Sequence, residues 1–143
     1  MSIAGNQFFT GIVNKPTTVP DLFVNRLTTT QITSGGPVIV TGKLATTMNT
    51  ITLSATSNTI QVTSNVMSVS ALGAVTIATI QGGISGQILT LIFSDTNVTI
   101  TDSSPGTLNQ ILLSAAFISA VNTVLTLVYN GTKWFEVSRS VNG

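Results

Sequence analysis

Short segments of alternating polar and β-branched residues recur along this chain. Residues 50–54 read Thr-Ile-Thr-Leu-Ser and residues 59–63 read Thr-Ile-Gln-Val-Thr, and an asparagine precedes each segment. A branched Cβ suits a pleated strand, and alternation with a period of two indicates a strand with one buried face. The pattern therefore predicts an all-β protein built from short strands.

The scarcity of charge supports this fold class. Charged residues make up 6% of the chain, against about 25% in typical soluble domains. Glutamate, lysine and arginine, which favour helices, are nearly absent, and threonine, serine and asparagine take their place. The five basic residues are scattered, whereas phosphate binding draws on clustered lysines and arginines. Nucleic acid is therefore not an expected partner.

The residue inventory leaves few routes to catalysis. The chain has no histidine and no cysteine, which excludes Ser-His-Asp and Cys-His arrangements and zinc–thiolate sites. Asp95 and Asp102 flank a predicted strand of about 23 Å, whereas paired hydrolase carboxylates lie about 5–10 Å apart. We therefore expect these two residues to stabilise turns, and we expect a non-enzymatic protein without metal or cofactor.

Further segments extend the strand pattern along the chain. The spacing of about 8–12 residues is typical of sandwiches, barrels and solenoids. Asn130-Gly131 suits the turn of a hairpin, and within residues 108–121 a strand followed by a loop is favoured over a helix. The other predicted strands are residues 38–40, 65–70, 74–80, 87–93, 97–101, 124–129 and 134–138. The arrangement stays open between a sandwich, a β-prism and a β-helix-like fold, with a homotrimer expected.

The N-terminal region differs from the rest, which divides the chain into an arm and linker, residues 1–41, and a β-rich oligomerisation domain, residues 42–143. Three of the four prolines fall in the first region, and proline interrupts β-ladders. Its apolar residues Phe8, Phe9, Leu22 and Phe23 are candidate anchors. They are expected either to attach the chain to another protein or to pack on its own domain.

Membrane insertion is not expected. The best candidate for a membrane-spanning helix is residues 111–129, where about 20 mostly apolar residues are needed. Several serine, asparagine and threonine residues interrupt this window. The start of the chain also lacks the basic and apolar regions of a secretory signal.

Two pairs near the C-terminus are candidates for a subunit interface. Trp134 and Phe135 are adjacent, so a strand directs them to opposite faces: one is expected in the core, and the other against a neighbouring subunit or a sugar. Glu136 and Arg139 face opposite sides of a regular strand, so each is expected to find its partner elsewhere, including in a neighbouring chain. The glycine-rich residues 82–86 match no phosphate-binding motif and are expected to connect two strands tightly.

Residues 80–139 resemble the C-terminal part of phage and large-DNA-virus fibre, spike and tail-associated structural proteins. The resemblance rests on an ordered set of motifs: Ile80-Gln81-Gly82-Gly83, Gly86-Gln87-Ile88-Leu89-Thr90-Leu91-Ile92-Phe93, Asn97-Val98-Thr99-Ile100-Thr101-Asp102, Ile111-Leu112-Leu113-Ser114, and a closing run from Leu125 to Arg139 that contains Tyr129-Asn130-Gly131 and Trp134-Phe135-Glu136-Val137-Ser138-Arg139. The closing run is the most specific part.

The resemblance implies a virion structural protein that forms homotrimers and contacts other capsid or tail proteins. Because the chain has no long shaft, a short fibre, a spike or a capsid decoration protein attached through the N-terminal arm is the expected form. A carbohydrate- or receptor-binding module for a host-surface glycan is the alternative, and a glycan-degrading enzyme with carboxylates shared between subunits is a third hypothesis.

Overall fold

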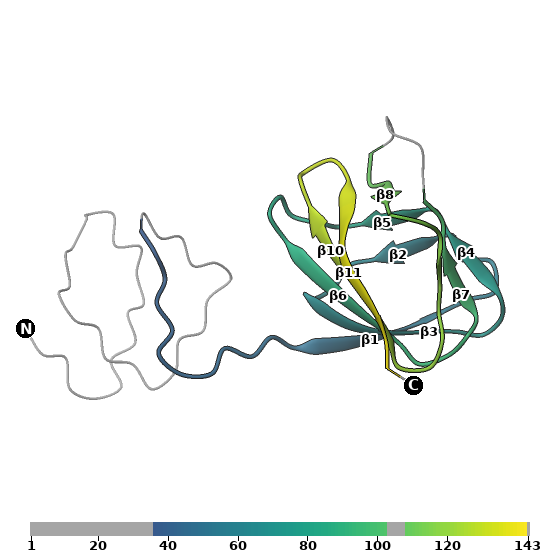
Figure 1. The fold of residues 1–143 in the computed structure, drawn as a ribbon, viewed down its shortest axis with the longest axis horizontal. Helices are drawn as coiled ribbons and strands as arrows, with labels where there is room; N and C mark the ends of the chain where they lie inside the picture. Colours follow the sequence, from purple (N-terminus) through teal and green to yellow (C-terminus); the bar gives the residue numbers. More distant parts are fainter. Residues whose placement is uncertain (1–35, 103–107, 143) are drawn as a thin grey trace, which may run out of the picture. The chain divides into compact units, whose positions relative to one another are not determined.

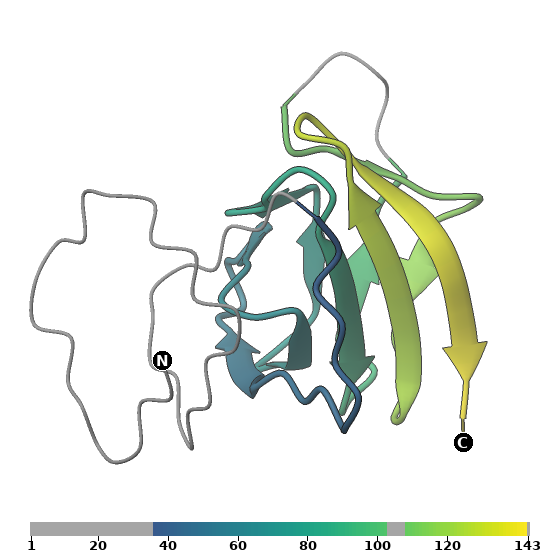
Figure 2. The same cartoon turned by 90° about the vertical axis from the view of Figure 1, so that its left-hand side faces the viewer.

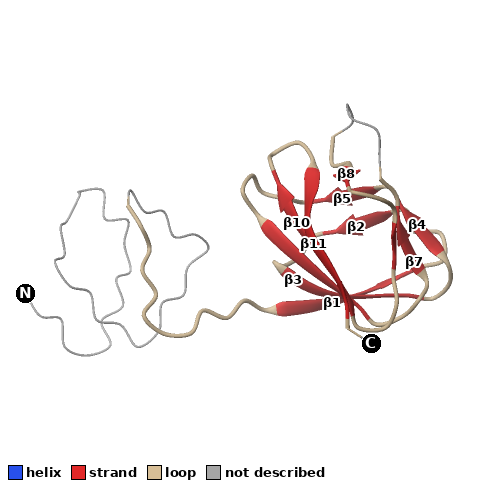
Figure 3. Cartoon of the chain, viewed as in Figure 1, coloured by secondary structure: helices blue, strands red, loops and turns tan. Residues whose placement is uncertain are grey.

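The protein is known from a computed structural model that describes residues 36–102 and 108–142, and the regular elements among these residues are all β-strands (Figure 3). The chain divides into two units between Thr41 and Gly42, and the described strands belong to the second unit. They are β1 (Met48–Leu53), β2 (Thr59–Gln61), β3 (Val66–Ala71), β4 (Val75–Ile77), β5 (Thr79–Gln81), β6 (Ile88–Phe93), β7 (Val98–Ile100), β8 (Ile111–Leu112), β9 (Phe117–Ile118), β10 (Thr123–Tyr129) and β11 (Trp134–Val141).

Successive circuits of the chain stack on one another as in a β-solenoid. The first circuit supplies β1 and β2, the second supplies β3, β4 and β5, and the third supplies β6 and β7 (Figure 1). Strands from different circuits pair in parallel: β1 with β3, β3 with β6, β2 with β5, and β4 with β7. The expected all-β fold is thus confirmed. Of the three arrangements that the sequence left open, the stacked circuits correspond to the β-helix-like one.

Identical triplets mark the stacking of the circuits. The sequence Thr-Ile-Gln forms both β2 and β5, and Val-Thr-Ile forms both β4 and β7, and each pair lies residue against residue in register. Between β2 and β5 the Thr59 and Thr79 hydroxyl oxygens are 2.8 Å apart. A stacked circuit repeats the environment of the one below it, so the same residues suit both levels.

The C-terminal strands end the parallel stacking. Strand β10 pairs with β6 in the antiparallel sense, and β11 returns along β10 as the second strand of a hairpin (Figure 2). The six-stranded sheet that results has the order β1-β3-β6-β10-β11-β8. The predicted hairpin is confirmed: Gly131 has a φ of 97°, and the Asn130 side chain accepts the backbone N–H groups of Thr132 and Lys133.

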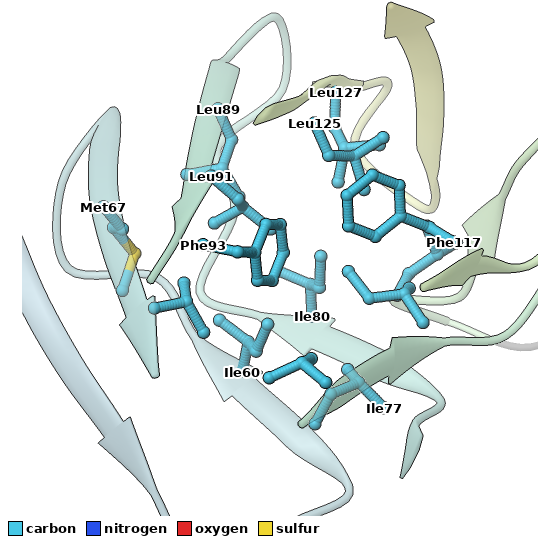
Figure 4. Packing of buried hydrophobic residues seen from close by; sticks show 14 of the residues in the cluster. Ile60, Met67, Ile77, Ile80, Leu89, Leu91, Phe93, Phe117, Leu125 and Leu127 are labelled. Atoms are coloured by element: carbon cyan, nitrogen blue, oxygen red, sulfur yellow. The ribbon is translucent and has the colours of Figure 1, made fainter. Parts of the chain in front are cut away.

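The core lies between the sheets and is almost purely aliphatic and aromatic. Inward positions of β6 and β10 direct Leu89, Leu91, Phe93, Leu125 and Leu127 toward isoleucines from the smaller sheets (Figure 4). These side chains are fully buried. Alternation along each strand sends one set of side chains inward and leaves the other set on the outside of the sheet.

Most predicted strands are confirmed with small shifts at their ends, but two predictions are wrong. Val38, Ile39 and Val40 form no strand, because no neighbouring strand of the described chain pairs with them. The single strand expected at residues 74–80 is two strands, β4 and β5, because the chain turns from one sheet to another at Ala78. Residues 108–121 contain two short strands, β8 and β9, joined by a loop.

The best candidate for a membrane-spanning helix is also β structure. Residues 111–129 contain β8, β9 and β10. Within residues 36–102 and 108–142, no helix has the length and apolar character needed to cross a membrane.

Candidate interaction surface

The exterior of the six-stranded sheet forms one continuous surface, which we call the outer face. It consists of the outward side chains of β1, β3, β6, β10 and β11, whose positions follow from the registers between these strands. The outer face comprises Met48, Thr50, Thr52, Val66, Ser68, Ser70, Ile88, Thr90, Ile92, Val124, Thr126, Val128, Phe135, Ser138 and Ser140.

No residue of the outer face carries a charge. The charged residues of the described chain lie in loops or on the other side of the sheet, and they are Lys43, Asp95, Asp102, Lys133, Glu136 and Arg139. Charge is depleted at the centre of protein–protein interfaces, because burying an unpaired charge is costly. The outer face therefore has the composition of a surface that another protein covers.

Two apolar rows cross the outer face at right angles to the strands. Ile88 lies opposite Val128, and Val128 lies opposite Phe135, so three adjacent strands present one row. Ile92 opposite Val124 starts a second row. Ile88 is 59% exposed and Phe135 is 37% exposed. Neighbouring large apolar side chains that are left in water favour association with a partner.

The two adjacent aromatic residues have different environments, as expected. Trp134 is fully buried, donates from its indole Nε1 to the Ile80 carbonyl oxygen at 2.8 Å, and packs on Tyr129 with ring centroids 4.7 Å apart. Phe135 lies on the outer face. Because Trp134 belongs to the core of its own chain, only Phe135 of this pair remains a candidate for the subunit interface.

The expectation for Glu136 and Arg139 is wrong, because β11 is not a regular strand. The register against β10 shifts by one residue: Ser138 lies opposite Thr126, Glu136 lies opposite Leu127, and Val137 is the extra residue of a β-bulge. The bulge brings Glu136 and Arg139 to the same side, where they form a salt bridge with each other. A bulge changes the alternation that the sequence argument assumed.

This salt bridge fastens the loop between β8 and β9. Glu136 Oε2 accepts the Ser114 N–H at 2.8 Å, and Arg139 Nη2 donates to the Ala115 carbonyl at 2.8 Å. The Arg139 guanidinium also lies 5.6 Å from the centre of the Phe117 ring, within cation–π range. The hydrogen bond from Arg139 lowers the pKa of Glu136 to about 2, with the Ser114 bonds adding to the effect and desolvation opposing it.

Asp95 and Asp102 hold backbone groups in place. Asp95 accepts the N–H groups of Ala71 at 2.7 Å and Asn97 at 2.8 Å, and it thereby joins the ends of β3 and β6 to the start of β7. Asp102 accepts the Leu113 N–H at 3.0 Å. Both carboxylates thus accept hydrogen bonds from their own chain. The bond from Asn97 to Asp95 is local, as expected for a residue that stabilises a turn, whereas Asp102 bonds to a residue eleven positions away. Among the described residues, no cluster of three or more acidic, histidine or cysteine side chains forms a potential metal site.

The glycine-rich segment connects β5 to β6, as predicted, and its second glycine lies against the core. A Cβ on Gly83 would stand 2.5 Å from Trp134 Cζ2 and 2.9 Å from Tyr129 Cδ1. Only a residue without a side chain fits there, since Cβ atoms do not approach carbon atoms this closely. The segment therefore serves the packing of the hairpin.

The candidate attachment residues Phe8, Phe9, Leu22 and Phe23 lie outside the described residues. No family model, curated protein or solved structure matches this chain.

Sequence reasoning missed the outer face as a unit, although a signal for it exists. The matched triplets Thr-Ile-Gln and Val-Thr-Ile recur after 20 and 23 residues, which is the length of one circuit. In the large sheet the offset is 18 residues between Met48 and Val66 and 24 residues between Val66 and Thr90, so the triplets indicate the repeat but not the register of the outer face. The nine residues from Thr50 to Thr59 relate strands of different sheets instead.

Proposed function

We propose that this chain is a non-enzymatic structural protein that works as an assembly of its own copies, and that the outer face is the surface through which the copies meet. The observation that carries the proposal is the absence of charge from the outward positions of five adjacent strands. A surface that stays in water gains solubility from charged side chains, and a surface that is covered does not need them.

Copies of the same chain are the partners that this surface suits best. Its apolar rows are flanked by serine and threonine hydroxyl groups, which can donate and accept hydrogen bonds. An uncharged face brings no electrostatic repulsion when it meets an identical face. Identical chains usually associate through closed cyclic symmetry, and a homotrimer is the form that the resemblance of residues 80–139 implies.

The resemblance also supports the biological setting. We propose a short fibre, spike or capsid decoration protein of a virion, attached to other capsid or tail proteins through residues 1–41. In such a particle many copies stand close together, and a chain with 6% charged residues limits the repulsion between them.

Replacing Ile88 with lysine tests the proposal. Ile88 is 59% exposed in the single chain, so Ile88→Lys should leave the fold of the protomer intact and introduce a charge into the outer face. Ile84→Lys is the matched control: Ile84 is 75% exposed but lies in the loop between β5 and β6. The mass in solution is measured by light scattering at the same protein concentration for all samples.

The wild type and Ile84→Lys are expected at about three times the chain mass of 14.8 kDa, and Ile88→Lys is expected to shift toward that of one chain. A burial penalty of several kcal/mol for an unpaired ammonium group accounts for the shift. A monomeric wild type at micromolar concentration contradicts the proposal, and so does an Ile88→Lys variant that assembles as well as the control.

A further inference from the structure

Asparagine is followed directly by glycine at two places in the chain, Asn130-Gly131 and Asn142-Gly143. In such a pair the glycine nitrogen can attack the asparagine side-chain carbonyl, because no side chain on the second residue blocks the approach. The reaction closes a cyclic imide, and its rate depends on how the two groups are held relative to each other. The two pairs have the same sequence, so their surroundings in the fold decide which one reacts faster.

Asn130 lies in the exposed turn between β10 and β11, and its side chain is folded back over that turn. The side-chain oxygen Oδ1 accepts the backbone N–H of Thr132 at 2.9 Å and that of Lys133 at 2.8 Å. The Asn130 N–H in turn donates to the Lys133 carbonyl at 3.0 Å. Because Oδ1 bonds to the two residues that follow Gly131, the side-chain carbonyl is held over the peptide groups of the turn.

The same two bonds prepare the side-chain carbonyl of Asn130 for attack. Two N–H groups that converge on one carbonyl oxygen stabilise the negative charge that develops there when a nucleophile adds to the carbon. The nucleophile is available as well, since no partner among the described residues accepts the Gly131 N–H. Gly131 has a φ of 97°, which glycine adopts without strain.

The side chain of Asn142 is held in a different way. Its Oδ1 accepts the Ser140 hydroxyl at 2.7 Å, and its Nδ2 donates to the Asn122 carbonyl at 3.2 Å. Both partners come earlier in the chain, so they draw the side chain back along β11 and not over the residue that follows. One hydroxyl donates to the oxygen that must take up the negative charge, whereas two N–H groups donate at Asn130.

We propose that Asn130 is a site of spontaneous modification, at which the folded turn promotes conversion of asparagine to aspartate and isoaspartate. The Gly131 nitrogen loses its proton to water and bonds to Cγ of Asn130, and the side-chain nitrogen takes up a proton and leaves as ammonia. Water then opens the cyclic imide at one of its two carbonyl carbons. One opening gives aspartate, and the other gives isoaspartate, in which the main chain runs through Cβ. The reaction concerns one chain and does not rest on the proposed assembly.

The two products differ in their effect on the hairpin. An aspartate carboxylate accepts the Thr132 and Lys133 N–H groups as the amide oxygen does, and its charge strengthens both bonds. Isoaspartate adds a methylene group to the main chain between Tyr129 and Trp134, which lie opposite each other and pack with ring centroids 4.7 Å apart. The modification therefore either keeps the turn and adds a negative charge, or loosens the packed base of the hairpin.

Incubation of the full wild-type chain at pH 8.5 and pH 6, with and without guanidinium chloride, tests the proposal. Chymotrypsin cleaves after aromatic residues, so Asn130 and Asn142 are recovered in separate peptides, residues 130–134 and 136–143. Mass spectrometry measures the replacement of the side-chain amide by an acid in each peptide. The Asn142 peptide is the internal control, because it contains the same Asn-Gly pair and passes through the same incubation.

In the folded chain at pH 8.5, Asn130 is expected to convert about tenfold faster than Asn142, which corresponds to about 1.4 kcal/mol in the barrier. In guanidinium chloride the two rates should become similar, and at pH 6 both should fall, because attack requires loss of the glycine amide proton. Asn130→Gln should show no conversion in its peptide, since the longer side chain does not close the same ring. Conversion of Asn130 no faster than that of Asn142 in the folded chain would overturn the proposal, and so would an unchanged ratio in denaturant.

Discussion

The salt bridge between Glu136 and Arg139 makes a pH-dependent contribution to stability that can be isolated. The pKa of Glu136 is lowered from 4.5 to about 2 in the folded chain. A carboxylate with a lowered pKa stabilises the folded state above its unfolded pKa, and this contribution is lost as the pH falls through the folded value. The loss is therefore expected between about pH 4.5 and pH 2.

The magnitude follows from the pKa and from the exposure of the pair. A pKa that falls from 4.5 to about 2 corresponds to at most about 3 kcal/mol. The Arg139 side chain is 32% exposed and the Glu136 side chain is 11% exposed, so solvent screens part of the interaction. We therefore expect Glu136→Gln to lower the free energy of unfolding by about 1–2 kcal/mol at pH 7.

Urea unfolding of the wild type and Glu136→Gln at pH 7, 4 and 2.5 measures this contribution. The protein concentration is fixed, because the stability of an oligomer depends on it. The difference between the two proteins should shrink as the pH falls, since the wild type loses its advantage. Arg139→Gln should resemble Glu136→Gln, because either change breaks the same pair. A difference that stays constant from pH 7 to 2.5 would refute the electrostatic account of this pair.

Two further predictions concern packing and turns. Gly83→Ala should destabilise the protein by about 1–3 kcal/mol, because the new Cβ collides with Trp134. Gly42→Ala should have little effect, because no heavy atom lies within 4 Å of a Cβ at that position. Urea unfolding followed by the fluorescence of the single tryptophan measures both variants. Asp95→Ala should lower the free energy of unfolding by about 1–3 kcal/mol, because it leaves the Ala71 N–H without its acceptor. The same assay measures this change, and an unchanged unfolding midpoint would contradict the role of this carboxylate.

The strands could be predicted from the sequence because their signals are local. In residues 50–54 and 124–129, apolar and polar side chains alternate, and the structure places a strand over most of each segment. The Asn130-Gly131 turn carries its own conformational preference. Val38, Ile39 and Val40 show the limit of such signals, since a strand also needs a neighbour, and the identity of the neighbour is not a local property.

The candidate site was predicted only in part, for the same reason. Because Trp134 and Phe135 are neighbours in the sequence, their placement on opposite sides of β11 could be predicted. The bulge at Val137 depends on the pairing of β11 with β10, so the sequence of β11 alone does not predict it. Without the bulge, Glu136 and Arg139 would face opposite sides of the sheet, and neither could fasten the loop between β8 and β9. The extra residue of the bulge therefore allows the salt bridge between Glu136 and Arg139 to hold this loop beside β11.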